Sequence, residues 1–153
     1  MAITTTTHLN FRGDARRALE FYQSVFGGDL TVVAYGDFGM PKELPDADKV
    51  VFGQLTAENG FRIMAYDAPG QSPSPIAPTA TTRVDGMTVT GERFFVAVGG
   101  DTAEEIEALW DGLADGAEII EAYAPSQFSP GFGMLTDRFG VTWILQVNAT
   151  RAG

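Results

Sequence analysis

The chain has 153 residues, no cysteine and a formal net charge of −10 from 10 basic and 20 acidic side chains, and 44 % of its residues are hydrophobic. This balance predicts one globular domain, and it excludes a disulfide framework, a thiolate metal site and a cysteine nucleophile; the acidity argues against nucleic acid as a partner, because phosphates require a basic stripe. No apolar run is long enough to cross a bilayer, and the first residues lack the basic and apolar regions of a secretory signal, so we expect a cytoplasmic protein without a membrane partner.

The first predicted elements form a strand, a helix and three further strands. A strand near Thr6–Phe11 precedes a helix that begins after Asp14, a favourable N-cap residue, and ends at the two glycines 27–28. The apolar residues of this helix recur at helical spacing: Ala15, Ala18, Leu19, Tyr22, Val25 and Phe26. The three strands are predicted near Leu30–Tyr35, Val50–Thr56 and Phe61–Tyr66. The unit is therefore βαβββ.

Prolines are frequent in the stretch that follows, over Asp67–Gly91. Proline lacks the backbone donor that helices and central strands need, so we expect Asp67 to about Thr82 to be a crossing segment. Val84–Thr90 is compatible with a short strand.

The same order of elements then returns. A strand is predicted near Arg93–Gly99, followed by a helix whose start, Thr102-x-x-Glu105, has the pattern of a capping box. The apolar stripe of this helix contains Ile106, Leu109, Trp110 and Leu113. The last three strands are predicted near Glu118–Tyr123, Gly133–Thr136 and Val141–Val147.

Matching residues at regular offsets indicate an internal duplication. Gly13 and Gly100 are 87 positions apart, and Ala34-Tyr35 and Ala122-Tyr123 are 88 apart, whereas FGQLT at 52–56 and FGMLT at 132–136 are 80 apart, eight fewer than 88. The smaller offset means that the connection near 36–49 is about eight residues longer in the first copy. We expect an α+β fold: two tandem βαβββ modules, about 4–67 and 92–149, joined by a crossing segment of about 68–91. The modules are expected to form a cleft-bearing mixed sheet within a single pseudo-symmetric domain, 1–153.

Two local motifs carry a family resemblance that spans nearly the whole chain. HLNFRGDA at 8–15 and TDRFGVTW at 136–143, on a duplicated βαβββ unit, resemble the PhnB-like subgroup of the vicinal-oxygen-chelate superfamily. This superfamily includes glyoxalase I, fosfomycin-resistance proteins, extradiol dioxygenases and bleomycin-binding proteins. Some members carry a methyltransferase label, but no strand–glycine-loop–helix unit for S-adenosylmethionine is visible here.

The resemblance implies where a metal would bind. Metal-dependent relatives place one ligand on the first strand of each module and one carboxylate on the last strand. The carboxylate positions correspond to Met64 and Ile144, which have no oxygen or nitrogen donor. On the first strands, His8 and Asn10 match Phe95 and Ala97, with Thr6 and Arg93 as alternatives, and only His8 is a plausible ligand. We therefore expect no metal and no cofactor.

Alternation along the strands predicts which side chains line the cleft. Phe61, Ile63 and Ala65, like Val141, Trp143, Leu145 and Val147, are expected to pack beneath the helices. The opposite set is expected to line a ligand-binding cleft, with Phe128 on a rim segment at 124–132: His8, Asn10, Arg62, Met64, Tyr66, Thr142, Ile144 and Gln146.

The functional interpretation of this cleft depends on two residues, Arg62 and His8. A guanidinium in a part-apolar cleft needs a carboxylate partner or an anionic ligand, unless Arg62 reaches solvent or pairs with a surface glutamate. His8 is a weak candidate for a general base, and its alternative role is a histidine hydrogen-bonded within the sheet.

These observations favour a protein that binds a small molecule without metal, as a homodimer and without enzymatic activity. Two alternatives stay open. One is a metal-dependent lyase, isomerase or dioxygenase of the same superfamily, and the other is an assembly protein whose cleft is filled by side chains.

Overall fold

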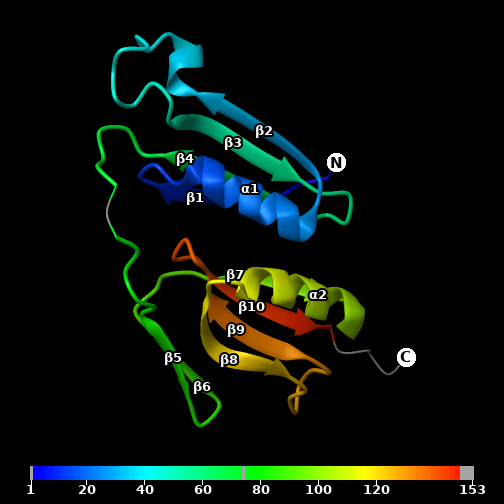
Figure 1. Cartoon of the computed structure of the whole chain (residues 1–153). Coiled ribbons are helices and arrows are strands. Elements are labelled where there is room, and N and C mark those ends of the chain that lie inside the picture. Colours follow the sequence, from blue (N-terminus) through cyan, green and yellow to red (C-terminus); the bar gives the residue numbers. More distant parts are fainter. Residues whose placement is uncertain (1, 74, 149–153) are drawn as a thin grey trace. The chain divides into compact units, whose positions relative to one another are not determined.

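A computed structural model describes residues 2–73 and 75–148 of the chain (Figure 1). It divides into two compact units, Met1–Pro75 and Ile76–Gly153. The elements are mixed α and β, and each unit contains one βαβββ module. The predicted fold class and the duplication are therefore confirmed, whereas the single domain over 1–153 stays a prediction. Within the described part of the chain, no helix combines the length and the apolar character needed to cross a bilayer.

The first unit is a four-stranded sheet with one helix packed on it. Its elements are β1 (Thr7–Phe11), α1 (Ala15–Phe26), β2 (Asp29–Ala34), the 3-10 helix η1 (Tyr35–Phe38), β3 (Val50–Thr56) and β4 (Arg62–Asp67). The strand order is β1-β4-β3-β2, with β1 parallel to β4 and the other pairs antiparallel. The two strands of the parallel pair are the first and the last of the module, so the chain passes through all the other elements between them.

The second unit repeats this topology and adds a hairpin. Its elements are β5 (Thr81–Val84), β6 (Met87–Thr90), β7 (Val96–Gly100), α2 (Ala103–Ala114), β8 (Glu118–Ala124), β9 (Phe132–Thr136) and β10 (Thr142–Val147). The strand order β7-β10-β9-β8 matches the first module strand for strand. The connection between β2 and β3 covers 35–49 and that between β8 and β9 covers 125–131, 15 residues against 7, which confirms the predicted difference of eight.

The core of each unit lies between its helix and its sheet. Ala18, Leu19 and Tyr22 of α1 are fully buried, as are Ile63 and Ala65 of β4. Leu19 packs so closely on the sheet that a Cβ atom at Gly53 would come within 2.4 Å of its Cδ1 atom. In the second unit, the fully buried side chains include Ile106, Leu113, Trp143 and Leu145. The helix-facing sets that alternation predicted are therefore buried, apart from the half-buried Phe61 and Val141.

The two helices begin differently. Asp14 occupies the N-cap position of α1, but its side chain makes no capping hydrogen bond, so the predicted role of this side chain is wrong. Instead, Oδ1 of Asp67 accepts hydrogen bonds from the backbone N–H groups of Gly13 (2.7 Å) and Ala15 (3.1 Å). In α2, Oγ1 of Thr102 accepts from the N–H of Glu105 at 3.3 Å, which confirms the first half of the capping box.

The crossing segment contains a hairpin that the sequence analysis did not predict. β5 begins at Thr81, within one residue of the predicted end of the strand-free stretch, and β6 lies within the short strand considered at Val84–Thr90. A two-residue turn separates β5 from β6. The turn residues Asp85 and Gly86 have φ of 51° and 77°. Asp-Gly favours such left-handed turns, and a dipeptide of this kind between short strands is a hairpin signal. The prolines upstream concealed this signal.

Candidate ligand-binding face

One face of the first unit's sheet, opposite α1, brings together five of the predicted site residues. His8 lies beside Met64 and Asn10 beside Tyr66 across the β1–β4 pair, while Arg62 begins β4 on the same face. These residues are His8, Asn10, Arg62, Met64 and Tyr66, and we call them the first-module face. The three on β4 are half-buried and the two on β1 are exposed.

His8 is held by its neighbours on this face. Its Nδ1 atom lies 3.1 Å from Oδ1 of Asn10, within hydrogen-bond distance, and its ring meets that of Tyr66 edge-on with 5.2 Å between centroids. This arrangement corresponds to the alternative interpretation of His8 as a hydrogen-bonded histidine within the sheet.

Arg62 has a cationic side chain whose Nε atom has no hydrogen-bond partner among the described residues. Its Nε atom is buried and has no hydrogen-bond acceptor, and no carboxylate of the described residues forms an ion pair with it. A buried donor without an acceptor costs free energy, because its bond to water has been lost. The surface glutamate that was the alternative partner is therefore not found among the residues that the structure describes.

Two side chains next to this face were missed by the sequence analysis. Thr56, the last residue of β3, lies directly opposite Arg62, and Gln54 lies opposite Met64. Nε2 of Gln54 lies 3.4 Å from Oγ1 of Thr56 and donates to it. Strand alternation on β3 could have found both residues, because it places positions 54 and 56 on the face opposite Leu55.

The corresponding face of the second unit is covered by the chain's own crossing segment. The guanidinium of Arg83 on β5 lies 5.0 Å from the ring centre of Phe132 on β9, and Thr88 on β6 contacts Sδ of Met134 at 3.8 Å. Among the predicted site residues of this module, Thr142 is buried, whereas Ile144 and Gln146 are half-buried. Alternation could not reveal this cover, because it depends on the hairpin.

The predicted rim residue Phe128 lies in the connection between β8 and β9. It is 57 % exposed, and its ring meets that of Phe132 edge-on with 5.1 Å between centroids. The segment is tied down beneath it, because Oγ of the buried Ser129 donates to the carbonyl oxygen of Val147 at 2.6 Å. Phe128 is thus an exposed aromatic side chain on an anchored connection of the second unit.

The four positions of the family's metal site do not fit a divalent ion. In the structure, His8 lies beside Met64 and the equivalent strand pair puts Ala97 beside Ile144. The match of His8 to Phe95 is therefore wrong by two residues, because the first strands of the two modules are offset by 89 positions, as from Phe11 to Gly100, and not by the 87 that separate Gly13 from Gly100. His8 is the only one of these four with a nitrogen or oxygen donor. No group of three or more His, Asp or Glu side chains that could hold an ion occurs in the described residues.

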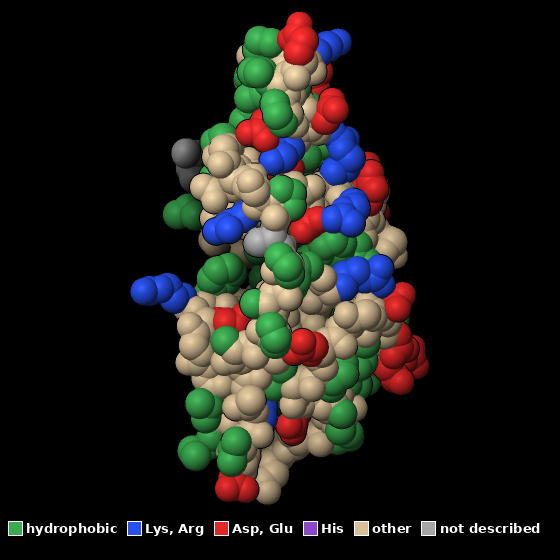
Figure 2. All heavy atoms as spheres, turned by 60° about the vertical axis from the view of Figure 1, so that its left-hand side comes forward, with side chains coloured by type: hydrophobic (Ala, Val, Ile, Leu, Met, Phe, Trp, Pro, Cys, Tyr) green, Lys and Arg blue, Asp and Glu red, His purple; other side chains and the backbone are tan. Residues whose placement is uncertain are grey.

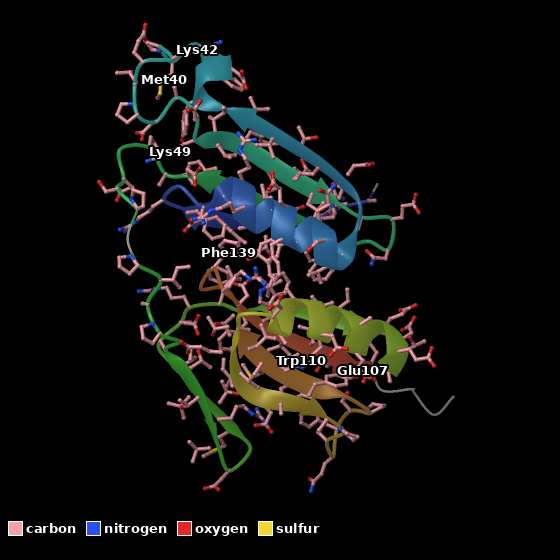
Figure 3. The ribbon with its side chains drawn as sticks, viewed as in Figure 1. Met40, Lys42, Lys49, Glu107, Trp110 and Phe139 are labelled. Atoms are coloured by element: carbon pink, nitrogen blue, oxygen red, sulfur yellow. The ribbon has the colours of Figure 1, made fainter. Side chains whose placement is uncertain are left out.

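The long connection between β2 and β3 carries Met40, Lys42 and Lys49 (Figure 3). The hydroxyl of Tyr35 donates to the carbonyl oxygen of Asp67 at 2.7 Å, and burial raises the pKa of this hydroxyl. A hydrogen bond from Lys49 lowers the pKa of Asp46, whose Oδ2 also accepts from the N–H of Gly70 at 3.1 Å. Asp46 therefore ties the connection to the start of the crossing segment.

Charged side chains on the surface are mixed in sign. On the side drawn in Figure 2, the Lys and Arg side chains of the described residues lie among Asp and Glu side chains rather than in one continuous stripe.

Comparisons with known proteins agree with this fold. The family model described as Glyoxalase/Bleomycin resistance protein/Dioxygenase superfamily matches residues 6–145. Protein YjdN of Escherichia coli is 27 % identical over 147 residues, which cover 92 % of either chain. The crystal structure of PA1353 from Pseudomonas aeruginosa has a TM-score of 0.72 at 26 % identity and covers 96 % of this chain and 98 % of its own. A Bacillus cereus structure described as a putative 3-demethylubiquinone-9 3-methyltransferase, PhnB protein, has a TM-score of 0.64 at 26 % identity, with 95 % and 99 % covered.

Proposed function

Because the chain belongs to the glyoxalase/bleomycin resistance/dioxygenase superfamily and is PhnB-like, we propose that it binds a small molecule, without a metal, on the first-module face. The observation that supports this proposal is Arg62, a half-buried residue whose buried Nε atom has no partner among the described residues and which lies beside the apolar side chain of Met64. Such a group is satisfied when an anion of the ligand accepts its hydrogen bonds.

The alternatives differ in what they need from the same residues. A metal-dependent lyase, isomerase or dioxygenase needs three or four protein ligands, and only His8 of the four family positions has a suitable donor. An assembly protein with a filled cleft would have both sheet faces occupied by side chains. The crossing segment supplies such a cover in the second unit. The first-module face keeps exposed polar side chains on β1.

Replacement of Arg62 by alanine tests this proposal. We expect Arg62→Ala to leave the melting temperature unchanged or slightly raised, because the substitution removes a buried donor that has no acceptor. Affinity for an anionic ligand found by a thermal-shift screen is expected to fall about tenfold or more, since a charge-assisted hydrogen bond contributes about 1.5–3 kcal/mol. Isothermal titration calorimetry measures the change.

Arg16→Ala is the matched control, because Arg16 is exposed on α1 and its loss changes the net charge equally. Equal affinity of Arg62→Ala and Arg16→Ala would contradict the role of Arg62. Tight, near-stoichiometric zinc, nickel, manganese or iron in protein purified without an affinity tag would instead support the metal-dependent enzyme.

We also propose that the protein acts as a homodimer in the cytoplasm. The absence of cysteine fits a reducing compartment, and large apolar side chains such as Met87 (65 % exposed) and Phe94 (59 % exposed) are surfaces that association would bury. Sedimentation velocity is expected to give about twice the chain mass of 16.4 kDa at micromolar concentration. A single species at the mass of one chain would contradict the dimer.

A further inference from the structure

The duplication makes one corner of the two sheets directly comparable. Across β3 and β4, Thr56 lies opposite Arg62, and across β9 and β10, Thr136 lies opposite Thr142. Thr136 follows Thr56 by 80 positions and Thr142 follows Arg62 by 80 positions, which is the offset between FGQLT and FGMLT in the sequence. Arg62 therefore occupies in the first module the position that Thr142 occupies in the second.

In the second module, this corner holds a carboxylate of the chain itself. Oε1 of Glu92 accepts a hydrogen bond from Oγ1 of Thr142 at 2.7 Å, and Oε2 accepts from Oγ1 of Thr81. The Glu92 backbone N–H donates to Thr90 Oγ1 at 2.9 Å, which fixes the approach of the side chain. Glu92 comes from the segment that precedes the first strand of its module, so the chain supplies an internal carboxylate to its own sheet face.

In the first module, the same corner has donors, and no carboxylate of residues 2–73 and 75–148 forms an ion pair or a hydrogen bond with them. Residues 1–6, which precede β1, include no Asp or Glu. The corner residues are Arg62, whose Nε atom is buried without an acceptor, and Thr56, whose hydroxyl is exposed. The first module thus has a guanidinium and a hydroxyl at the position where, in the second module, threonine hydroxyls bind the Glu92 carboxylate.

From this comparison we infer that the ligand of the first-module face carries a carboxylate, bound at the Arg62–Thr56 corner, with an apolar body directed along β4 over Met64. This inference rests on the proposed function, because it names the chemical class of the ligand for the same face. The planar guanidinium matches both oxygens of a carboxylate. One guanidinium neutralises one negative charge, so a dianionic phosphonate would carry an unbalanced charge into a protein whose net charge is −10.

The Nε–Hε group of Arg62 reports on this binding directly in ¹⁵N-labelled protein. The probes are benzoate, benzamide and phenylphosphonate, which share one apolar ring and differ in the group offered to the corner. We expect benzoate to shift the Arg62 Nε–Hε signal along a saturating curve, and benzamide and phenylphosphonate to need about tenfold higher concentration or more. The amide signals of Thr56 and Met64 are expected to move with it.

Variants separate Arg62 from general charge effects. Arg62→Gln is expected to weaken benzoate binding about tenfold or more, as read from the amides of Thr56 and Met64, whereas Arg16→Gln is expected to leave it unchanged. If Arg62→Gln does not fold, Arg62→Lys is the second variant. It keeps the charge but loses the planar, paired donors of the guanidinium, so it is expected to bind benzoate more weakly than the native protein.

The outcomes distinguish this inference from the proposed function. Benzamide or phenylphosphonate binding at the face as tightly as benzoate would overturn the carboxylate and leave a small-molecule-binding face. Benzoate binding that neither Arg62→Gln nor Arg62→Lys weakens would also overturn it. If no probe moved any signal of the first-module face, both the inference and the proposed function would be overturned.

Discussion

Replacement of Asp67 by alanine is expected to lower the free energy of unfolding by about 3–5 kcal/mol, because three backbone N–H groups lose their acceptor. The carboxylate is 1 % exposed; its Oδ1 accepts from Gly13 and Ala15, and its Oδ2 accepts from Val50 at 2.9 Å. It therefore joins the start of α1, the start of β3 and the end of β4. Asp67→Asn is expected to cost less, since an amide keeps one acceptor oxygen.

Urea unfolding followed by circular dichroism measures this effect. Tryptophan fluorescence does not report on the first unit, because both tryptophans, Trp110 and Trp143, lie in the second unit. Hydrogen exchange is expected to show loss of protection in α1 and retained protection in β10. Asp14→Ala is the matched control, since Asp14 holds the N-cap position without a side-chain capping bond and is expected to cost less than about 0.5 kcal/mol. Equal costs for the two alanine variants would refute the role assigned to Asp67.

Replacement of Asp137 by alanine is expected to destabilise the second module by about 2–4 kcal/mol. Asp137 is 3 % exposed, and its Oδ1 accepts from the N–H groups of Phe139 (2.8 Å) and Val141 (3.1 Å). Its Oδ2 accepts from Nε1 of Trp143 at 2.9 Å, and Trp143 is fully buried. Without Asp137, the indole N–H and the turn lose an acceptor in a place that water does not reach.

A double-mutant cycle with Trp143→Phe isolates the indole bond. The coupling free energy from urea titrations is expected to be about 1–2 kcal/mol. Asp115→Ala serves as the control, because its ion pair with Arg138 is exposed and is expected to contribute less than about 1 kcal/mol. Strict additivity of the Asp137 and Trp143 substitutions would show that their hydrogen bond contributes nothing to stability.

Local pattern was sufficient for most of the fold. Helical spacing located both helices, and alternation separated the buried side of β4 and β10 from the other side. Both signals are short-range, because side-chain direction repeats every two residues in a strand and every 3.6 in a helix. The hairpin at 81–90 was concealed by prolines upstream, and the equivalence of His8 was displaced by two residues. The pair Gly13 and Gly100 gave an offset of 87 for the first strands, whereas the strand pairing relates Phe11 to Gly100, an offset of 89.

For the candidate site, too, local pattern predicted some features and not others. Alternation grouped the five residues of the first-module face correctly on one side, with Arg62 among them. The role of Glu92 could not be foreseen, because its carboxylate meets Thr142 through the fold rather than through neighbouring positions. Strand alternation could have predicted Thr56, since it lies on the same face of the adjacent strand.

By itself, then, the amino-acid sequence determined the α+β class, the duplicated βαβββ order, the longer first connection and the side of each strand that faces a helix. Each follows from backbone geometry and the burial of apolar side chains over a few residues. Only the tertiary structure decided that Asp67 rather than Asp14 supplies the acceptor at the start of α1. It also decided that Glu92 binds Thr142 in the second module, at the position equivalent to the one that Arg62 occupies in the first. A buried polar group must find its partner wherever the folded chain brings one, so such pairings depend on distances in space and not on spacing along the chain.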